Sequence, residues 1–220
     1  MKPFVKSKKL LVATMVAALC LTTATCFAMG KIAGYAGGTH RVSDEYPSSA
    51  KIEKVLHAPA DSIEKFSNGF AFTSYSVGKT SSYDENGNKM ETLPEVALEY
   101  QNADQTWLVL NISPVFAGQT FDAPGATEIP YNDEIMFRYH NDHYRFVPVD
   151  YEISPEEQEL MDANQLYISY GADEVDDCYM SGISWVKDGL CYHLGGKDLP
   201  LDQNDMVQMA KEIITQGAAR

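Results

Sequence analysis

The 220-residue sequence lacks the short motifs by which many enzymes are recognised. It contains no Gly-x-Ser-x-Gly elbow, no Gly-x-x-x-x-Gly-Lys-Ser/Thr phosphate-binding loop, no Gly-x-Gly-x-x-Gly and no His-Glu-x-x-His. No Ser, Cys or Asp stands at a diagnostic offset from any of the five histidines, which are His40, His57, His140, His143 and His193. We therefore expect no catalytic residues, no cofactor and no enzymatic activity. The alternative is an envelope enzyme whose catalytic groups converge from distant positions.

Basic residues are also scarce, with 17 Lys and Arg against 31 Asp and Glu and a net charge of −14. Removing residues 1–28 takes away four lysines and no acidic residue, which moves the net charge to −18. Proteins bind nucleic acids and anionic membrane surfaces through clustered Lys and Arg. The composition therefore argues against a nucleic acid partner, and it is typical of a solvated, exported acidic protein.

Long hydrophobic runs are missing too. The apolar segment from Leu10 to Leu21 is shorter than the roughly 20 residues that a spanning helix needs. Four lysines precede it, and Cys26-Phe27-Ala28 offers a small-x-small cleavage site. Residues 1–28 therefore indicate a signal peptide or, if uncleaved, an N-terminal anchor in contact with the membrane. Either places the rest of the chain outside the cytoplasm, secreted or anchored to the cell membrane.

The chain after residue 28 divides by composition into two parts. Residues 29–48 contain four scattered glycines among polar residues and predict a flexible tether. Residues 49–217 are long enough to bury one core, and we expect a single extracytoplasmic α+β domain.

The clearest structural signal is Asp188-Gly189, which stands between two alternating runs. Asp-Gly predicts a type I′ turn, because that turn needs φ > 0 at both central residues. Trp185 then pairs with Tyr192 and Ser184 with His193, so one hairpin face is apolar and the other more polar. After Gly195-Gly196, a helix over residues 203–215 is expected, capped by Asp202, with its apolar stripe on the hairpin.

The same register decides the state of two cysteines, Cys178 and Cys191. Val186 faces Cys191, and the eight residues that separate Val186 from Cys178 span roughly 26 Å of extended strand. A disulfide needs Cα atoms within about 7 Å. We predict two free thiols, and without a CxxC motif no structural zinc site.

Further hairpins are predicted around Asp84-Glu85-Asn86-Gly87-Asn88 and around residues 102–104. In the second the register is ambiguous, and Leu108, Leu110 and Ile112 make the cleaner inward stripe, facing Val96, Leu98 and Tyr100. The remaining elements are a short helix that is capped by Ser48-Ser49 and ends before Pro59, a helix that begins with the capping box Ser154-Pro155-Glu156-Glu157, and a strand from 166 to 170. Residues 114–133 show no periodicity, so they are either a binding lid or a passive insertion.

Three segments were weighed as metal sites. A third hairpin around Asn141-Asp142 makes His140 face His143, a pair able to chelate a transition metal, but no third ligand is indicated. The turn at 84–88 has alternating oxygens but lacks the glycine spacing of a calcium loop. The acidic stretch 172–177 is typical of a solvated loop. We expect no metal site.

Several segments carry a resemblance to a known family: Phe66-Ser67-Asn68-Gly69-Phe70, Ser184-Trp185-Val186, Gly189-Leu190-x-Tyr192-x-Leu194, and a closing helix through Met206, Ala210 and Ile213. Over about residues 50 to 215, the chain resembles a family of exported proteins of unknown function from Gram-positive bacteria. It is similar to the extracytoplasmic C-terminal domain of some membrane-bound anti-sigma factors, and distantly to the lipoprotein-carrier fold. That fold implies a curved antiparallel sheet wrapped over helices, with a hydrophobic cavity between them. The resemblance transfers no catalytic residues.

These observations predict an α+β fold, in which a curved antiparallel β-meander packs against a C-terminal helix and short N-terminal helices, as in a lipoprotein-carrier-like half barrel. For function they favour a non-catalytic, extracytoplasmic module of sensor or regulatory type. Its expected partner is an apolar ligand such as a lipid, or an envelope protein.

Overall fold

The computed structural model describes residues 34–119, 121 and 125–217. The expected signal or anchor segment, residues 1–28, and the first residues of the expected tether lie outside these ranges. Within them, no helix is long and apolar enough to cross a membrane.

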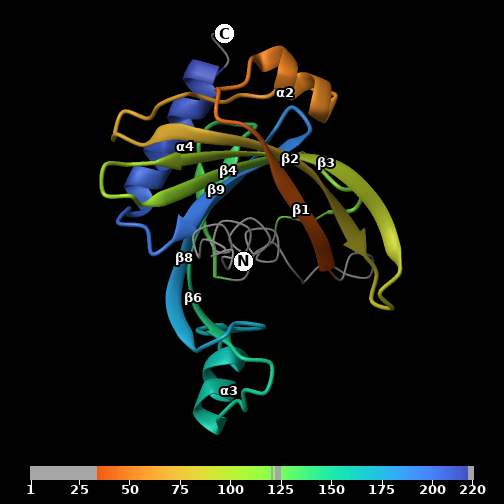
Figure 1. Cartoon of the computed structure of the whole chain (residues 1–220), viewed down its shortest axis with the longest axis vertical. Coiled ribbons are helices and arrows are strands. Elements are labelled where there is room, and N and C mark those ends of the chain that lie inside the picture. Colours follow the sequence, from red (N-terminus) through yellow and green to blue (C-terminus); the bar gives the residue numbers. More distant parts are fainter. Residues whose placement is uncertain (1–33, 120, 122–124, 218–220) are drawn as a thin grey trace, which may run out of the picture.

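The described residues fold as an α+β domain built on one open, curved and largely antiparallel sheet (Figure 1). Its strand order is β1-β2-β3-β4-β9-β8-β6-β5, and β7 pairs in parallel with β6. The strands are β1 (Gly34–Ser43), β2 (Ala71–Tyr83), β3 (Lys89–Gln101), β4 (Trp107–Pro114), β5 (Thr127–Pro130), β6 (Met136–Val147), β7 (Tyr167–Tyr170), β8 (Asp176–Lys187) and β9 (Leu190–Lys197). The helices are α2 (Ser49–Leu56), α3 (Pro155–Asp162) and α4 (Gln203–Gly217).

The predicted hairpin of β8 and β9 is confirmed in its register. Trp185 pairs with Tyr192 and Ser184 with His193, and the turn residues Asp188 and Gly189 have φ of 52° and 77°. The inward stripe expected for β4 is confirmed too, because Leu108, Leu110 and Ile112 are buried, and the structure settles the register with Leu98 opposite Leu110. The turn at 84–88 joins β2 to β3, and the Asp84 carboxylate accepts hydrogen bonds from its neighbours within the turn.

The predicted hairpin around Asn141-Asp142 is wrong, because β6 runs straight through these residues. Asn141 pairs with Ser181 and Asp142 with Met180 of β8, and the Ser181 hydroxyl donates a 2.7 Å hydrogen bond to Asn141 Oδ1. Asn-Asp favours a turn only while no partner strand is available. Here β8 supplies that partner over nine consecutive residue pairs.

The predicted tether is wrong for residues 34–43, which form the edge strand β1. Glycines on both strands allow β1 and β2 to approach closely: a Cβ on Gly37 of β1 would stand 2.5 Å from Thr80 Oγ1, and one on Gly78 of β2 would stand 2.0 Å from the carbonyl oxygen of Gly38. Glycine in this segment therefore marks tight strand packing rather than a free linker. Part of the irregular stretch 114–133 likewise forms β5, which pairs with β6.

Helices α2 and α4 lie on the same side of the sheet, and the ends of the sheet bend away from them (Figure 1). The main apolar core fills the space on this helix side, with Trp185 stacked on Tyr192 at 5.0 Å between ring centroids and edge-on to Phe137. Asp202 caps α4 as predicted, since its Oδ1 accepts hydrogen bonds from the backbone N–H of Asn204 and Asp205. The opposite side of the sheet is therefore its concave face.

Candidate functional site: the concave face of the sheet

The two histidines that were weighed as metal ligands do not meet. His140 and His143 stand three residues apart in one strand, so their side chains leave opposite faces of the sheet. His143 stacks on Tyr179 and has its Nε2 3.0 Å from Asp177 Oδ1. His140 instead stacks on His193. Across the described ranges, no group of three or more His, Cys, Asp or Glu side chains could hold a metal ion.

A row of polar side chains crosses the concave face at right angles to the strands. Asn111 of β4 pairs with His193 of β9, which pairs with Ser184 of β8, which pairs with Arg138 of β6. Glu95 of β3 and His140 of β6 flank this row on the same face. We call these six residues the polar strip.

Glu95 is the one carboxyl group of the strip and is deeply buried, with 1% of its surface exposed. Its Oε2 accepts a 2.6 Å hydrogen bond from the Thr80 hydroxyl, whereas its Oε1 has no partner among the described residues. Burial raises the pKa of Glu95 to about 7, although the hydrogen bond from Thr80 acts to lower it. Near neutral pH the side chain is therefore partly protonated and can donate as well as accept.

Asn111 offers both kinds of hydrogen-bonding group to this face. It is 5% exposed, and within the described part of the chain neither Oδ1 nor Nδ2 has a hydrogen-bond partner. A buried polar group without a partner costs about 1–3 kcal/mol of stability. A molecule that supplies one hydrogen-bond donor and one acceptor side by side would satisfy both polar atoms of the Asn111 amide.

The His140 and His193 rings stack at 5.4 Å between centroids, with 19° between their planes. Gly182 and Gly195, paired across β8 and β9, make room for them: a Cβ on Gly182 would lie 2.5 Å from His140 Nε2, and one on Gly195 would lie 2.9 Å from His193 Nε2. Burial, followed by the neighbouring His140, lowers the pKa of His193 to about 3. His193 is therefore a neutral imidazole at physiological pH.

Two carboxylates stand beside the β6 end of the strip. His140 Nδ1 lies 3.0 Å from Asp142 Oδ2, yet neither ring nitrogen has a well-aligned hydrogen bond to any described residue. Arg138 Nε lies 3.2 Å from Glu128 Oε1, and its guanidinium lies over the Phe121 ring at 5.8 Å. The charge of Arg138 is thus compensated by a neighbouring acid.

Neither of the cysteines in the described ranges, Cys178 and Cys191, is an activated nucleophile. Both are free, as predicted. Burial raises the pKa of the Cys191 thiol to about 12 and that of the Cys178 thiol to about 11. A thiol with so high a pKa is protonated at physiological pH and reacts slowly. The concave face therefore presents neutral hydrogen-bonding groups rather than an activated nucleophile and base.

Sequence reasoning found the more polar face of the Asp-Gly hairpin, with Ser184 and His193, but missed Glu95, Asn111 and Arg138. The sequence does contain a signal for two of these residues. Glu95 in β3 and Asn111 in β4 interrupt runs of apolar residues, at positions that alternate with the side chains facing the main core. Their convergence also requires the pairing of β4 with β9, which no local pattern shows.

Comparison with protein families, with curated proteins and with solved structures finds no match to this chain. The resemblance to exported Gram-positive proteins therefore stays a prediction, and the interpretation of the concave face depends on the geometry of its own residues.

Proposed function

We propose that this chain is an extracytoplasmic, non-catalytic binding module of sensor or regulatory type, and that its ligand lies on the polar strip. The observation that carries the proposal is Asn111, a buried side-chain amide without a described partner on either polar atom. Native proteins pair nearly all buried polar groups, so a buried amide without a partner calls for an explanation, and a bound ligand supplies one.

The chemistry of the strip selects for a polar ligand that is uncharged at the point of contact. His193 is neutral, Glu95 is partly protonated, and Arg138 already has Glu128 beside it. A buried ionic group on the ligand would need an opposite charge, which the centre of the strip does not offer. Amides and hydroxyl-rich groups meet the requirement.

An apolar ligand between the sheet and the helices has less support. Met206 and Met209 of α4 are 0% and 1% exposed and belong to one continuous core with the apolar side chains of the sheet. The alternative of an enzyme has less support as well, because burial keeps the Cys191 and Cys178 thiols protonated and the lowered pKa of His193 makes its imidazole a weak base. The proposed location outside the cytoplasm depends on residues 1–28.

Native mass spectrometry of the protein, purified from its own host envelope without denaturation, tests the proposal. We expect wild-type protein to carry an added mass that Asn111→Leu lacks, while Asn111→Leu is as stable as wild type or more so, because it removes an unpaired buried amide. Asn204→Leu, an exposed substitution at the start of α4, serves as the control and should keep the added mass. Wild-type protein with the mass of the bare polypeptide would contradict the proposal.

A further inference from the structure

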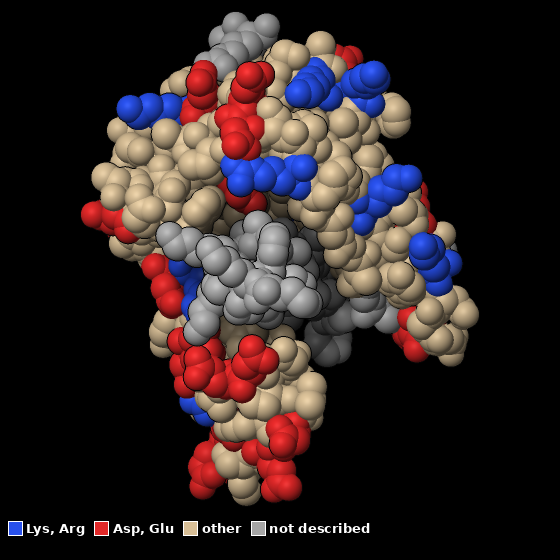
Figure 2. Space-filling view, viewed as in Figure 1, with Lys and Arg blue, Asp and Glu red and all other residues tan. Residues whose placement is uncertain are grey.

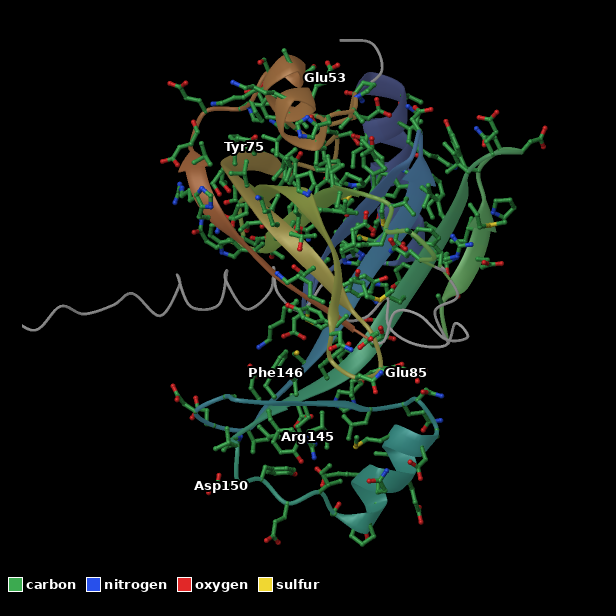
Figure 3. The ribbon with its side chains drawn as sticks, turned by 90° about the vertical axis from the view of Figure 1, so that its right-hand side faces the viewer. Glu53, Tyr75, Glu85, Arg145, Phe146 and Asp150 are labelled. Carbon is green, nitrogen blue, oxygen red and sulfur yellow. The ribbon has the colours of Figure 1, made fainter. Side chains whose placement is uncertain are left out.

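A second surface lies far from the polar strip, at the end of the molecule opposite α2 and α4 (Figure 3). Residues 146–179, which we call the acidic arm, comprise the end of β6, α3, β7 and the start of β8. Their inner side chains join Tyr144 in a small cluster with Cys178 and Met180, separate from the main core. Figure 3 shows Arg145, Phe146 and Asp150 around the base of this arm.

Helix α3 buries a polar side chain and no apolar one. Its only buried residue is Glu157, whose carboxylate accepts hydrogen bonds from Arg145, from Tyr151 and from the backbone N–H of Ser154. An eight-residue helix is marginal in water unless it packs an apolar face. In the structure α3 has no such packing, and Leu160 is exposed.

Exposed apolar side chains concentrate on the arm. Five of the eight large hydrophobic side chains that are exposed in the described part of the chain belong to it: Val149, Leu160, Tyr170, Val175 and Tyr179. Val149 is 82% exposed. Apolar side chains scattered singly over a surface need no explanation, but a concentration of them marks a contact surface.

The charge of the arm identifies the class of partner. Between Phe146 and Val186 the sequence has ten Asp and Glu and no Lys or Arg. Glu157, Asp176 and Asp177 pair with Arg145 or Lys197. The other seven have no ion pair with any described residue: Asp150, Glu152, Glu156, Glu159, Asp162, Asp173 and Glu174. Figure 2 shows the acidic residues gathered on this end of the molecule.

We propose that the acidic arm docks a Lys- or Arg-rich amphipathic segment of another protein, with α3 and the exposed apolar side chains at the contact. Charge complementarity favours this partner, because the uncompensated carboxylates attract cationic segments and speed their encounter. Anionic lipid surfaces and nucleic acids are repelled by the same field. A second copy of the chain carries the same acidic arm and is repelled as well. The proposal goes beyond the polar strip and is independent of it.

Fluorescence anisotropy with a labelled, amphipathic Lys/Leu peptide as the probe tests the proposal on the full chain. We expect saturable binding that weakens at least tenfold when salt is raised from 50 to 500 mM. The double variant Val149→Ser with Leu160→Ser should weaken it at least fivefold. Met90→Ser, at an apolar position on β3 that is about as exposed as Leu160, should leave it unchanged. A Glu/Leu peptide of the same length should not bind.

Charge reversal provides a second variant that does not depend on the apolar side chains. Glu156→Lys with Glu159→Lys, both on exposed positions of α3, changes the charge of the arm by four units and should weaken binding of the Lys/Leu peptide at least fivefold. Equal binding of the Lys/Leu peptide to wild type and to the Val149/Leu160 variant would overturn the proposal. Binding to anionic phosphatidylglycerol vesicles, or dimerisation in sedimentation measurements, would overturn it in favour of a membrane or a second copy.

Discussion

Replacing Glu95 by glutamine should stabilise the protein at alkaline pH and leave it nearly unchanged at acidic pH. The glutamine amide oxygen can accept the same hydrogen bond from Thr80, so that the substitution chiefly removes the ability to ionise. In the folded protein the pKa of Glu95 is about 7 against an ordinary value of 4.5. A carboxyl whose pKa is raised on folding binds its proton more tightly in the folded state, so it makes the stability fall as pH rises from 4.5 to beyond 7.

The magnitude follows from the size of this shift. A difference of one pKa unit corresponds to about 1.4 kcal/mol, so that ionised Glu95 costs about 3 kcal/mol once both states are deprotonated. Glu95→Gln should therefore raise the free energy of unfolding by about 3 kcal/mol at pH 8 and by less than about 1 kcal/mol at pH 5. Comparing the variant with wild type at each pH isolates the contribution of Glu95 to the pH dependence of stability. Other titrating groups, His193 among them, are present in both proteins and cancel in the difference.

Urea unfolding followed by tryptophan fluorescence, at half-unit steps from pH 5 to 8, measures this difference. Glu99→Gln is a matched control: Glu99 lies on the same face of β3, accepts a hydrogen bond from Ser74 and is only half-buried. The Glu95→Gln difference should depend on pH more strongly than the Glu99→Gln difference, because Glu95 is the more deeply buried of the two carboxyl groups. If the free energies of unfolding of Glu95→Gln and wild type differ by a constant amount from pH 5 to 8, the pKa of Glu95 is not raised by burial. The polar strip would then not be neutral.

Three further predictions concern the fold. Trp185→Ala should cost about 3–5 kcal/mol, and lower Tm by on the order of 10 °C, because it empties the centre of the core beneath α4; a loss below about 1 kcal/mol in urea unfolding would contradict this packing. Denatured, unreduced protein that lacks residues 1–28 should react with two equivalents of a thiol reagent, from Cys178 and Cys191, and zero equivalents would indicate a disulfide. Gly78→Ala should displace β1 and cost about 1–3 kcal/mol, with faster amide exchange in residues 34–43; unchanged exchange there would contradict the close β1–β2 contact.

The parts of the fold that sequence predicts correctly are those in which the deciding interaction is local. The Asp188-Gly189 turn needs two residues with positive φ, and these residues supply them whatever surrounds the hairpin. The capping box at α3 is likewise complete within four residues, with Ser154 and Glu157 satisfying each other's backbone. In both cases the chemistry of a short segment determines its conformation.

The parts that sequence predicts incorrectly depend on partners distant in the chain. Asn141-Asp142 has the composition of a turn, and only β8, about 40 residues later, makes it a strand. The glycines of β1 have the composition of a linker, and only the surface of β2 gives them a packing role. The polar strip is the extreme case, since its residues come from β3, β4, β9, β8 and β6, and the insertion of β9 next to β4 brings them together.

The most direct test of the polar strip as a binding site is the side-chain amide resonance of Asn111. Its ¹⁵N–¹H signal, assigned by its loss in Asn111→Leu, is recorded for protein isolated with its ligand and again after denaturation, removal of small molecules and refolding. The exposed side-chain amide of Asn204 serves as the reference. If a ligand lies on the strip, the chemical shift of the Asn111 amide should differ between the two preparations, while that of the Asn204 amide should be the same in both. Identical Asn111 signals in the two preparations would contradict the account.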